Sequence, residues 1–334
     1  MPIVEVKDLV KVYNGSVKAV DGISFQVDEG EIFGFLGPNG AGKTTTISIL
    51  TTLIRPTSGS ATVCGHDIVK DACDVRRAIG LVPQELTVDD DLTGRENMIL
   101  QGDLYGVPKE ELVDRVDGLL DLIGLTDAAD RMVKTYSGGM RKRLELAEGL
   151  VHHPRVLFLD EPTLGLDVQT RAAIWEHIQD LKAKHNTTIF LTTHYLEEAD
   201  ALCDRIGIID HGKIVALDSP RALKAALGGD VIEIVIEGGD DHSDNISMVE
   251  GVMDSRMTDG VHRIKAANGE EIAPGVLSML WDKGERVKSV NISRPNLDQV
   301  FMEYTGRSLR DAMQSSTQDK GQRMASAMQA RRRR

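Results

Sequence analysis

The chain has 334 residues, which is long enough for two domains that each bury a core. Its formal net charge of −13 argues against general nucleic-acid binding, which requires a basic face. We see no secretory signal before Val4 and no apolar stretch near eighteen residues, so we expect no membrane span. The three cysteines, Cys64, Cys73 and Cys203, lack metal-ligand spacing and indicate free thiols in a reducing compartment. Any membrane role therefore requires a partner.

Short apolar runs alternate with helical patterns through about residue 225, as expected of an α/β domain. The candidate buried strands are residues 32–36, 79–83, 156–160, 188–192 and 206–210. Residues 110–123 place Leu112, Val116 and Leu119 on one helical face, which we assign to the core. We therefore predict one α/β domain over residues 1–225.

The first of these strands runs directly into a glycine-rich loop. The loop consists of Gly37, Pro38, Asn39, Gly40, Ala41, Gly42, Lys43, Thr44 and Thr45. A strand, a glycine loop and a helix start form the arrangement that wraps a nucleoside triphosphate, since glycine amides converge on phosphate without steric conflict. Lys43 is expected to bridge the β- and γ-phosphates, and the Thr44 hydroxyl to bind Mg²⁺. The alternative is a glycine-rich turn without a ligand, although every required position is filled.

The strand at 156–160 ends in two adjacent carboxylates. Asp160 suits a Mg²⁺ shell, and Glu161 is placed to polarise an attacking water. Because Pro162 and Thr163 follow, an ordinary helix cap is the alternative interpretation.

Ser137, Gly138 and Gly139 precede a helix predicted over 141–151 and form a second candidate anion site. A helix cap with a glycine pair is again the alternative. Two phosphate-binding elements in one chain suggest a nucleotide held between two copies, each covering the ATP of the other.

The pattern changes near residue 226. Residues 231–237 alternate as a strand, residues 287–293 form another, and Leu297, Val300 and Phe301 indicate a closing helix. We predict a small α+β domain over 226–307. Residues 308–334 contain seven Lys or Arg against two Asp or Glu, and we predict a disordered basic tail there, including the arginines at 331–334.

In this order, the elements resemble the ATP-binding-cassette (ABC) ATPases, the nucleotide-binding subunits of transporters. The resemblance covers about residues 4–225 and rests on six separate elements. It implies a P-loop NTPase fold with a RecA-like core, an antiparallel β subdomain and a helical subdomain at about 85–150, followed by the small C-terminal α+β domain.

The resemblance also implies roles for single residues. The loop at 37–45 is similar to the Walker A motif, Asp160 and Glu161 to the Walker B aspartate and catalytic glutamate, and residues 137–139 to the signature motif. Gln84 matches the glutamine that links the Mg²⁺ site to the membrane partner, and Asp167 the loop that crosses the dimer interface. His194 matches the switch histidine at the γ-phosphate.

Three further residues bear on the resemblance, one at the adenine position and two in the signature motif. Tyr13 lies where the family stacks an aromatic ring on adenine, although a lone tyrosine is also common in packing. Tyr136 and Met140 replace the commonest signature residues, Leu and Gln, and resemble the daunorubicin-resistance-type (ABC-2 exporter) ATPases. Residues 294–301 and 305–307 resemble the closing motif of that subgroup.

The resemblance implies an ATPase that uses ATP and Mg²⁺ as a dimer of itself or with a close homologue. It would drive a separate transmembrane permease from the cytoplasmic face of the cell membrane, in the direction of export. Two other classes compete. A cassette that acts on ribosomes or DNA is disfavoured by the single cassette and the lack of heptads. A regulatory module without hydrolysis is disfavoured by Glu161 and His194.

Overall fold

The computed structural model describes residues 2–313, apart from 186, 259, 294, 310 and 312. The predicted tail from residue 314 onward, including 331–334, and Arg294 of the predicted closing motif therefore lie outside the described residues. The chain divides into two compact units, the first reaching to Ser219 and resuming at the buried Leu309, and the second spanning Pro220–Ser308. This division falls shortly before residue 225, and what each unit contributes to function stays a prediction.

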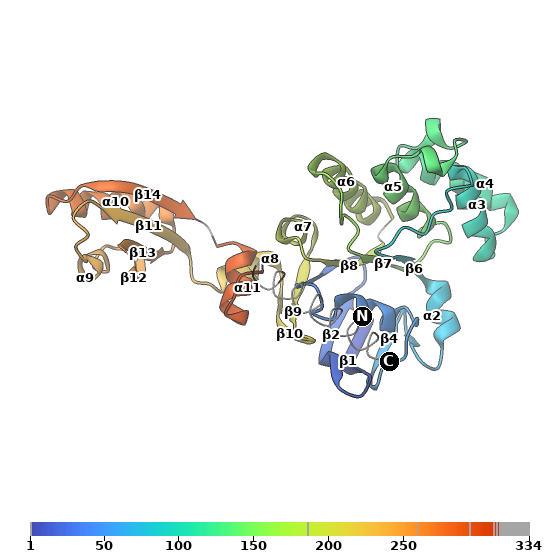
Figure 1. Cartoon of the computed structure of the whole chain (residues 1–334), viewed down its shortest axis with the longest axis horizontal. Helices are drawn as coiled ribbons and strands as arrows, with labels where there is room; N and C mark the ends of the chain where they lie inside the picture. The colour runs from blue at the N-terminus through green and yellow to red at the C-terminus, as the bar shows by residue number, and fades with distance from the viewer. Residues whose placement is uncertain are drawn as a thin grey trace, which may run out of the picture. The chain divides into compact units, whose positions relative to one another are not determined.

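The first unit is built on a six-stranded sheet in the order β10-β9-β3-β8-β7-β6 (Figure 1). Its strands are β3 (Ile32–Leu36), β6 (Ile79–Val82), β7 (Val156–Asp160), β8 (Thr188–Thr193), β9 (Arg205–Asp210) and β10 (Lys213–Asp218). All but the edge strand β10 run parallel. β3, β7 and β8 are buried at every position, as their continuous apolar sequences predict. The predicted strands are all present.

A second, antiparallel sheet in the order β2-β1-β4-β5 belongs to the same unit. Its strands are β1 (Pro2–Tyr13), β2 (Val17–Asp28), β4 (Ser58–Val63) and β5 (His66–Asp67). Phe25 of β2 stacks on Phe33 of β3 with ring centroids 5.4 Å apart, and Phe35 and Phe190 complete the aromatic cluster. The two sheets therefore share one hydrophobic core.

Helices of the first unit connect these strands. They are α1 (Lys43–Leu50), α2 (Ala72–Ala78), α6 (Val168–His185) and α7 (Leu196–Leu202). Within the described residues, no helix has the length and apolarity that a bilayer crossing requires.

A helical region lies on one side of the six-stranded sheet, drawn in green and teal in Figure 1. It contains α3 (Gly94–Leu104), α4 (Lys109–Leu122), α5 (Gly138–Glu148) and the short 3-10 turns Thr126–Ala128 and Val133–Thr135. Leu112 and Val116 of α4 pack into its separate core, which confirms the predicted core face. Tyr136 is buried there and donates its hydroxyl hydrogen to the Ala128 carbonyl at 2.6 Å.

The limits predicted for α5 were wrong. The helix begins at Gly138 rather than at 141, because Ser137 has extended backbone and its hydroxyl accepts from the Met140 amide at 3.3 Å. It ends at Glu148 rather than at 151, before Gly149. The glycine pair therefore forms the first turn of the helix.

The second unit is an antiparallel sheet in the order β12-β13-β11-β14 with helices. Its elements are α8 (Pro220–Ala225), β11 (Asp230–Ile236), α9 (Ser243–Ile246), β12 (Val252–Thr258), β13 (Val261–Ala266), α10 (Gly269–Asp282), β14 (Val287–Ser293) and α11 (Leu297–Thr305). Ile232 and Ile234 of β11 form a core with Val276 and Leu280 of α10. The region between the two predicted strands, which carried little pattern, contains β12, β13 and α10.

Candidate nucleotide-binding site

The glycine loop lies where β3 ends and α1 begins, at the carboxyl edge of the parallel sheet. Gly42, the N-cap of α1, has φ 111°, in the left-handed region that favours glycine. A β-carbon at this position would also overlap the Ala19 carbonyl oxygen. The backbone of β2 and the loop therefore approach each other as only glycine permits.

Lys43 is the first residue of α1, and its side chain turns back over the loop. Only 4% of it is exposed. The Nζ atom donates to the Gly37 carbonyl at 2.7 Å and to the Pro38 carbonyl at 3.2 Å, and lies 3.1 Å from Glu161 Oε1. The loop thus holds its one cation beside the carboxylate at the end of β7.

The carboxylates lie where parallel register predicts. Asp160, the last residue of β7, is paired with Thr192 of β8. Its Oδ1 accepts from Thr192 Oγ1 at 2.6 Å and from Thr44 Oγ1 at 3.2 Å. Two strands and the start of α1 therefore meet at one carboxylate oxygen.

Glu161 follows with φ 49°, an uncommon conformation for a residue other than glycine. Its amide donates to Thr192 Oγ1 at 3.0 Å and to the Thr192 carbonyl at 3.1 Å. These bonds hold the backbone in place, so that the side chain turns toward Lys43 and His194.

The ionisation of Glu161 reflects opposing influences. Burial alone would raise the pKa of its carboxyl. The hydrogen bond with His194 Nδ1, at 3.0 Å, and the charge of Lys43 outweigh burial and hold this pKa below its usual value. Glu161 is therefore an anion at neutral pH, paired with a cation on one side and an imidazole on the other.

Lys43 and Glu161 face a cleft of about 370 Å³, whereas Asp160 and His194 are not among the residues that line it. It is lined by Ala19, Asn39, Gly40, Gly42, Lys43, Thr44, Thr45, Gln84, Glu161 and Leu164. Gln84 follows β6 and brings an amide to the same edge of the sheet. The structure thus gathers the predicted loop, Gln84 and Glu161 around one space.

Ser137, Gly138 and Gly139 are not among the residues that line this cleft. Ser137 and Gly138 are exposed, and a β-carbon on Gly138 would meet open space. A β-carbon on Gly139 would overlap Thr170 Cγ2, so the start of α5 packs closely on the first turn of α6. The predicted second anion site therefore lies apart from the first within one chain.

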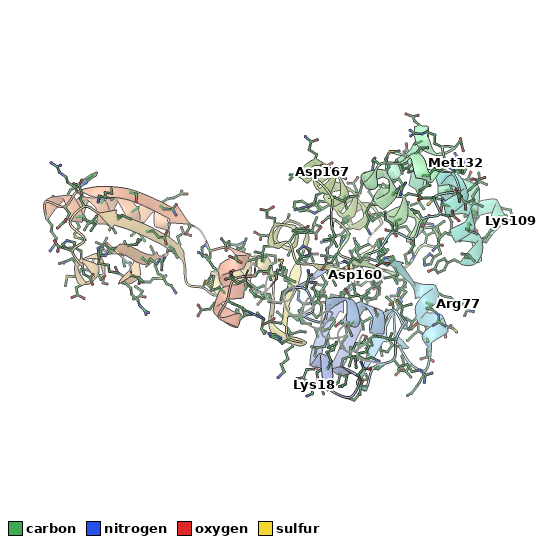
Figure 2. All side chains as sticks on the ribbon, in the orientation of Figure 1. Lys18, Arg77, Lys109, Met132, Asp160 and Asp167 are labelled. Carbon is green, nitrogen blue, oxygen red and sulfur yellow. The ribbon has the colours of Figure 1, made fainter. Side chains whose placement is uncertain are left out.

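Asp167 lies just before α6 and is exposed. Its carboxylate accepts from the Thr170 amide at 2.9 Å and from the Thr170 hydroxyl at 2.7 Å. These two hydrogen bonds lower the pKa of Asp167, and the opposite effect of burial on this pKa is smaller. Figure 2 shows Asp160 among the central strands of the first unit and Asp167 well away from it, near α6.

Tyr13 ends β1 with 39% of its surface exposed, and it is not among the residues that line the cleft. Lys11 Nζ lies 5.2 Å from the centroid of its ring. The role of this ring at adenine stays a prediction.

Sequence reasoning missed Thr192 and Glu198. The sequence pattern assigned Thr192 to a strand without a functional role. The pairing of the parallel strands β7 and β8, which sets Thr192 beside Asp160, is the signal that could have found it. Glu198 of α7 is fully buried and accepts from Thr163 Oγ1 at 2.8 Å and from Trp175 Nε1 at 3.0 Å. No spacing in the sequence indicates that network, because its three members come from separate elements.

Comparison with known proteins identifies the chain's relatives. A family model described as ABC transporter matches residues 20–164. The daunorubicin/doxorubicin resistance ATP-binding protein DrrA of Streptomyces peucetius is 41% identical over 92% of this chain and 94% of its own length. The chain belongs to the ABC transporter family of ATP-binding proteins. A second model, the C-terminal domain of DrrA1-3-like ATP-binding proteins, matches residues 219–305 of this ABC protein and confirms the predicted subgroup resemblance.

Other relatives of this ABC protein carry related names. The linearmycin resistance ATP-binding protein LnrL of Bacillus subtilis is 36% identical over 92% of the chain and 99% of its own length. The Nod factor export ATP-binding protein I of Ralstonia nicotianae is 38% identical over 93% of the chain and 96% of its own length.

Solved structures confirm the predicted cassette fold. CbiO1 from Clostridium perfringens, part of the ABC transporter complex cbiONQ, superposes with a TM-score of 0.63 at 27% identity, covering 67% of this chain and 91% of that one. The dimeric structure of a post-hydrolysis state of the ATP-binding cassette MJ0796, bound to ADP and Pi, superposes with a TM-score of 0.59 at 26% identity. The match covers 65% of this chain and 98% of that one.

Proposed function

We propose that this ABC protein is the ATP-hydrolysing subunit of an exporter and works as a pair of copies that holds two ATP molecules. The observation that carries the proposal is the contact of Glu161 with both Lys43 and His194 beside the glycine loop. A cation for the phosphates, an ionised carboxylate that can accept a proton from water and an imidazole beside it together suit phosphoryl transfer to water.

The chain's own residues divide the work as follows. Lys43 and the loop amides bind the phosphates, and the terminal phosphate then competes with Glu161 for Lys43. Glu161, released from that ion pair, orients the water and accepts its proton. His194 stays hydrogen-bonded to Glu161 and reaches the terminal phosphate from the end of β8. Tyr13 would stack on adenine.

The oxygen atoms at this edge fit Mg²⁺. Thr44 Oγ1 and Asp160 Oδ1 lie 3.2 Å apart, and the Gln84 side chain lines the same cleft. A hydroxyl, a carboxylate and an amide oxygen are donors that Mg²⁺ accepts beside phosphates and water. When bound, Mg²⁺ offsets phosphate charge during hydrolysis. We assign Thr44, Asp160 and Gln84 to hold it.

The second copy supplies the missing phosphate contacts. Ser137 and Gly138 are exposed and lie outside the cleft, so their hydroxyl and amides are available to the ATP of another chain. Asp167, also exposed, would lie at the interface between the copies. The dimeric relative solved with ADP and Pi supports this pairing.

A separate permease would complete the exporter. Relatives similar over nearly the whole chain are named for daunorubicin, doxorubicin and linearmycin resistance and for Nod factor export. We infer export of a drug-like or lipid-like compound, driven from the cytoplasmic face of the membrane, with residues 226–307 as an accessory domain.

The experiment that tests hydrolysis is Glu161→Gln. The amide keeps the size of the side chain but cannot accept the proton, so turnover should fall by about 100-fold or more. ATP binding should persist, because the loop and Lys43 are unchanged. Phosphate release and equilibrium binding of a fluorescent ATP analogue measure the two quantities. Undiminished phosphate release by the purified variant would reject the role of Glu161.

A further inference from the structure

Helix α5 holds both ends of the loop that carries Gln84. Lys142 Nζ donates to the Pro83 carbonyl at 3.0 Å, just before Gln84. Glu145 Oε1 accepts from the Thr87 amide at 2.8 Å and from the Thr87 hydroxyl at 2.9 Å, just after it. A single helix turn thus brackets the segment that lines the cleft.

The two clamping side chains also bind each other. Lys142 Nζ and Glu145 Oε2 are 2.8 Å apart, and the residues are only 6% and 2% exposed. A buried ion pair adds little stability over a well-packed apolar pair, so stability alone does not account for it. The geometry of the pair accounts for it better. Lys142 and Glu145 each make a further hydrogen bond to the loop, so the pair connects the loop to the helix.

The same helix begins with the exposed phosphate-binding residues. Ser137 is its N-cap and Gly138 its first residue, one turn before Lys142. The 83–87 loop is therefore joined through these contacts and a single helix to the start of α5.

We propose that Lys142 and Glu145 are positioning residues that transmit the state of Gln84 in one chain's cleft to the 137–139 segment that this chain offers to its partner. The inference rests on the proposed function. It adds which side chains fix the Gln84 loop to the helix that begins with this segment, namely the buried pair Lys142 and Glu145.

The kinetic test is a double-mutant cycle with Gln84→Ala and Glu145→Gln in the full chain. Glu145→Gln should lower kcat about tenfold, as loss of one charge-assisted interaction predicts, with the KM for ATP within about twofold because Lys43 and its loop are untouched. In the Gln84→Ala background, the same substitution should produce no further loss, since the clamp acts through that loop.

Glu148→Gln provides the matched control. Glu148 lies one turn further along α5 and is 8% exposed. The charge of Glu145 helps to raise the pKa of Glu148, but no hydrogen bond to the 83–87 loop involves Glu148 among those described. This control should keep kcat within about twofold of the wild type. If Glu145→Gln changed kcat as little as Glu148→Gln does, the positioning role would be wrong. It would also be wrong if Glu145→Gln lowered kcat equally with and without Gln84.

Amide hydrogen exchange tests the clamp without hydrolysis. In the full chain without nucleotide, Glu145→Gln should speed exchange of the peptide covering 84–87 about tenfold, and Glu148→Gln should leave it unchanged. Equal exchange in both variants would overturn the inference even if the chain hydrolyses ATP. A wild-type chain that binds but does not hydrolyse ATP would instead overturn the proposed function alone.

Discussion

At the scale of single residues, the least expected member of the site is Thr192. Its hydroxyl donates to Asp160 and accepts from the Glu161 amide, so it sets the geometry of both carboxylates. Thr192→Val keeps the shape but leaves the Asp160 oxygen with one donor fewer. We expect the free energy of unfolding to fall by about 1–3 kcal/mol and ATP turnover to fall with it.

Thr188→Val separates these two effects. Thr188 is equally buried in β8, but its hydroxyl accepts from Gly30 at the opposite end of the strand. Urea unfolding and phosphate release should show lost stability with unchanged turnover for Thr188→Val. Equal loss of turnover in both variants would mean that Thr192 acts on stability only.

Glu148 gives the fold a dependence on pH. Burial first, and then the charge of Glu145, raise the pKa of Glu148 to about 8 from 4.5. Between these values the folded chain keeps a proton that the unfolded chain releases, so raising the pH favours unfolding. The contribution of the Glu148 carboxyl to the free energy of unfolding is therefore fully present below about pH 4.5 and is lost by about pH 8.

Glu148→Gln should remove that dependence. Relative to this variant, the wild type should lose stability in urea unfolding as the pH rises from 5 toward 8. A stability difference that stays constant over this interval would show that Glu148 ionises normally.

At the scale of elements, the contact between α5 and α6 depends on Gly139. A methyl group there would overlap Thr170 Cγ2, so Gly139→Ala should lower stability by about 1–3 kcal/mol. Adding Thr170→Ser removes Cγ2, keeps the hydroxyl that Asp167 accepts, and should restore stability. Thermal unfolding measures both, and a single variant as stable as the wild type would contradict the packing described.

Gly138→Ala probes the other glycine of the pair. A β-carbon there meets open space in one chain, so the unfolding temperature should not fall. In the proposed pair of copies, the same methyl group faces the partner's ATP, and turnover should therefore drop. Unchanged turnover would place Gly138 away from the nucleotide.

Elements with strong periodicity were predictable from the sequence. Strands such as 32–36 and 156–160 are apolar at nearly every position, and the glycine loop between β3 and α1 has the spacing typical of a nucleotide-binding loop. The start of α5 could not be predicted, because the Ser137 hydroxyl caps the helix and extends it over a glycine pair of low helical propensity.

At the scale of the whole molecule, the site was easier to predict than the second unit. Asp160 and Thr192 meet because β7 and β8 are parallel neighbours, which follows from the fold class. In the second unit, Gly269 and Pro274 lower the helical propensity of α10, although Ala273, Val276 and Leu280 follow a helical spacing. β12 exposes Met253 and buries Ser255, so its sequence does not show an apolar alternation. Pairing with β13 determines β12, and packing on the β11 side chains determines α10.

In the proposed pair of copies, a complete site needs residues from two chains. Lys43→Ala removes the phosphate cation from a chain's own cleft, and Ser137→Arg blocks the segment offered to the partner. Each variant alone should be inactive. Mixed in equal amounts under exchange, they should recover about a quarter of wild-type phosphate release, because half of the pairs are mixed and each has one complete site. Activity of Ser137→Arg alone, or no recovery from a mixture shown to exchange chains, would show that one chain completes its own site.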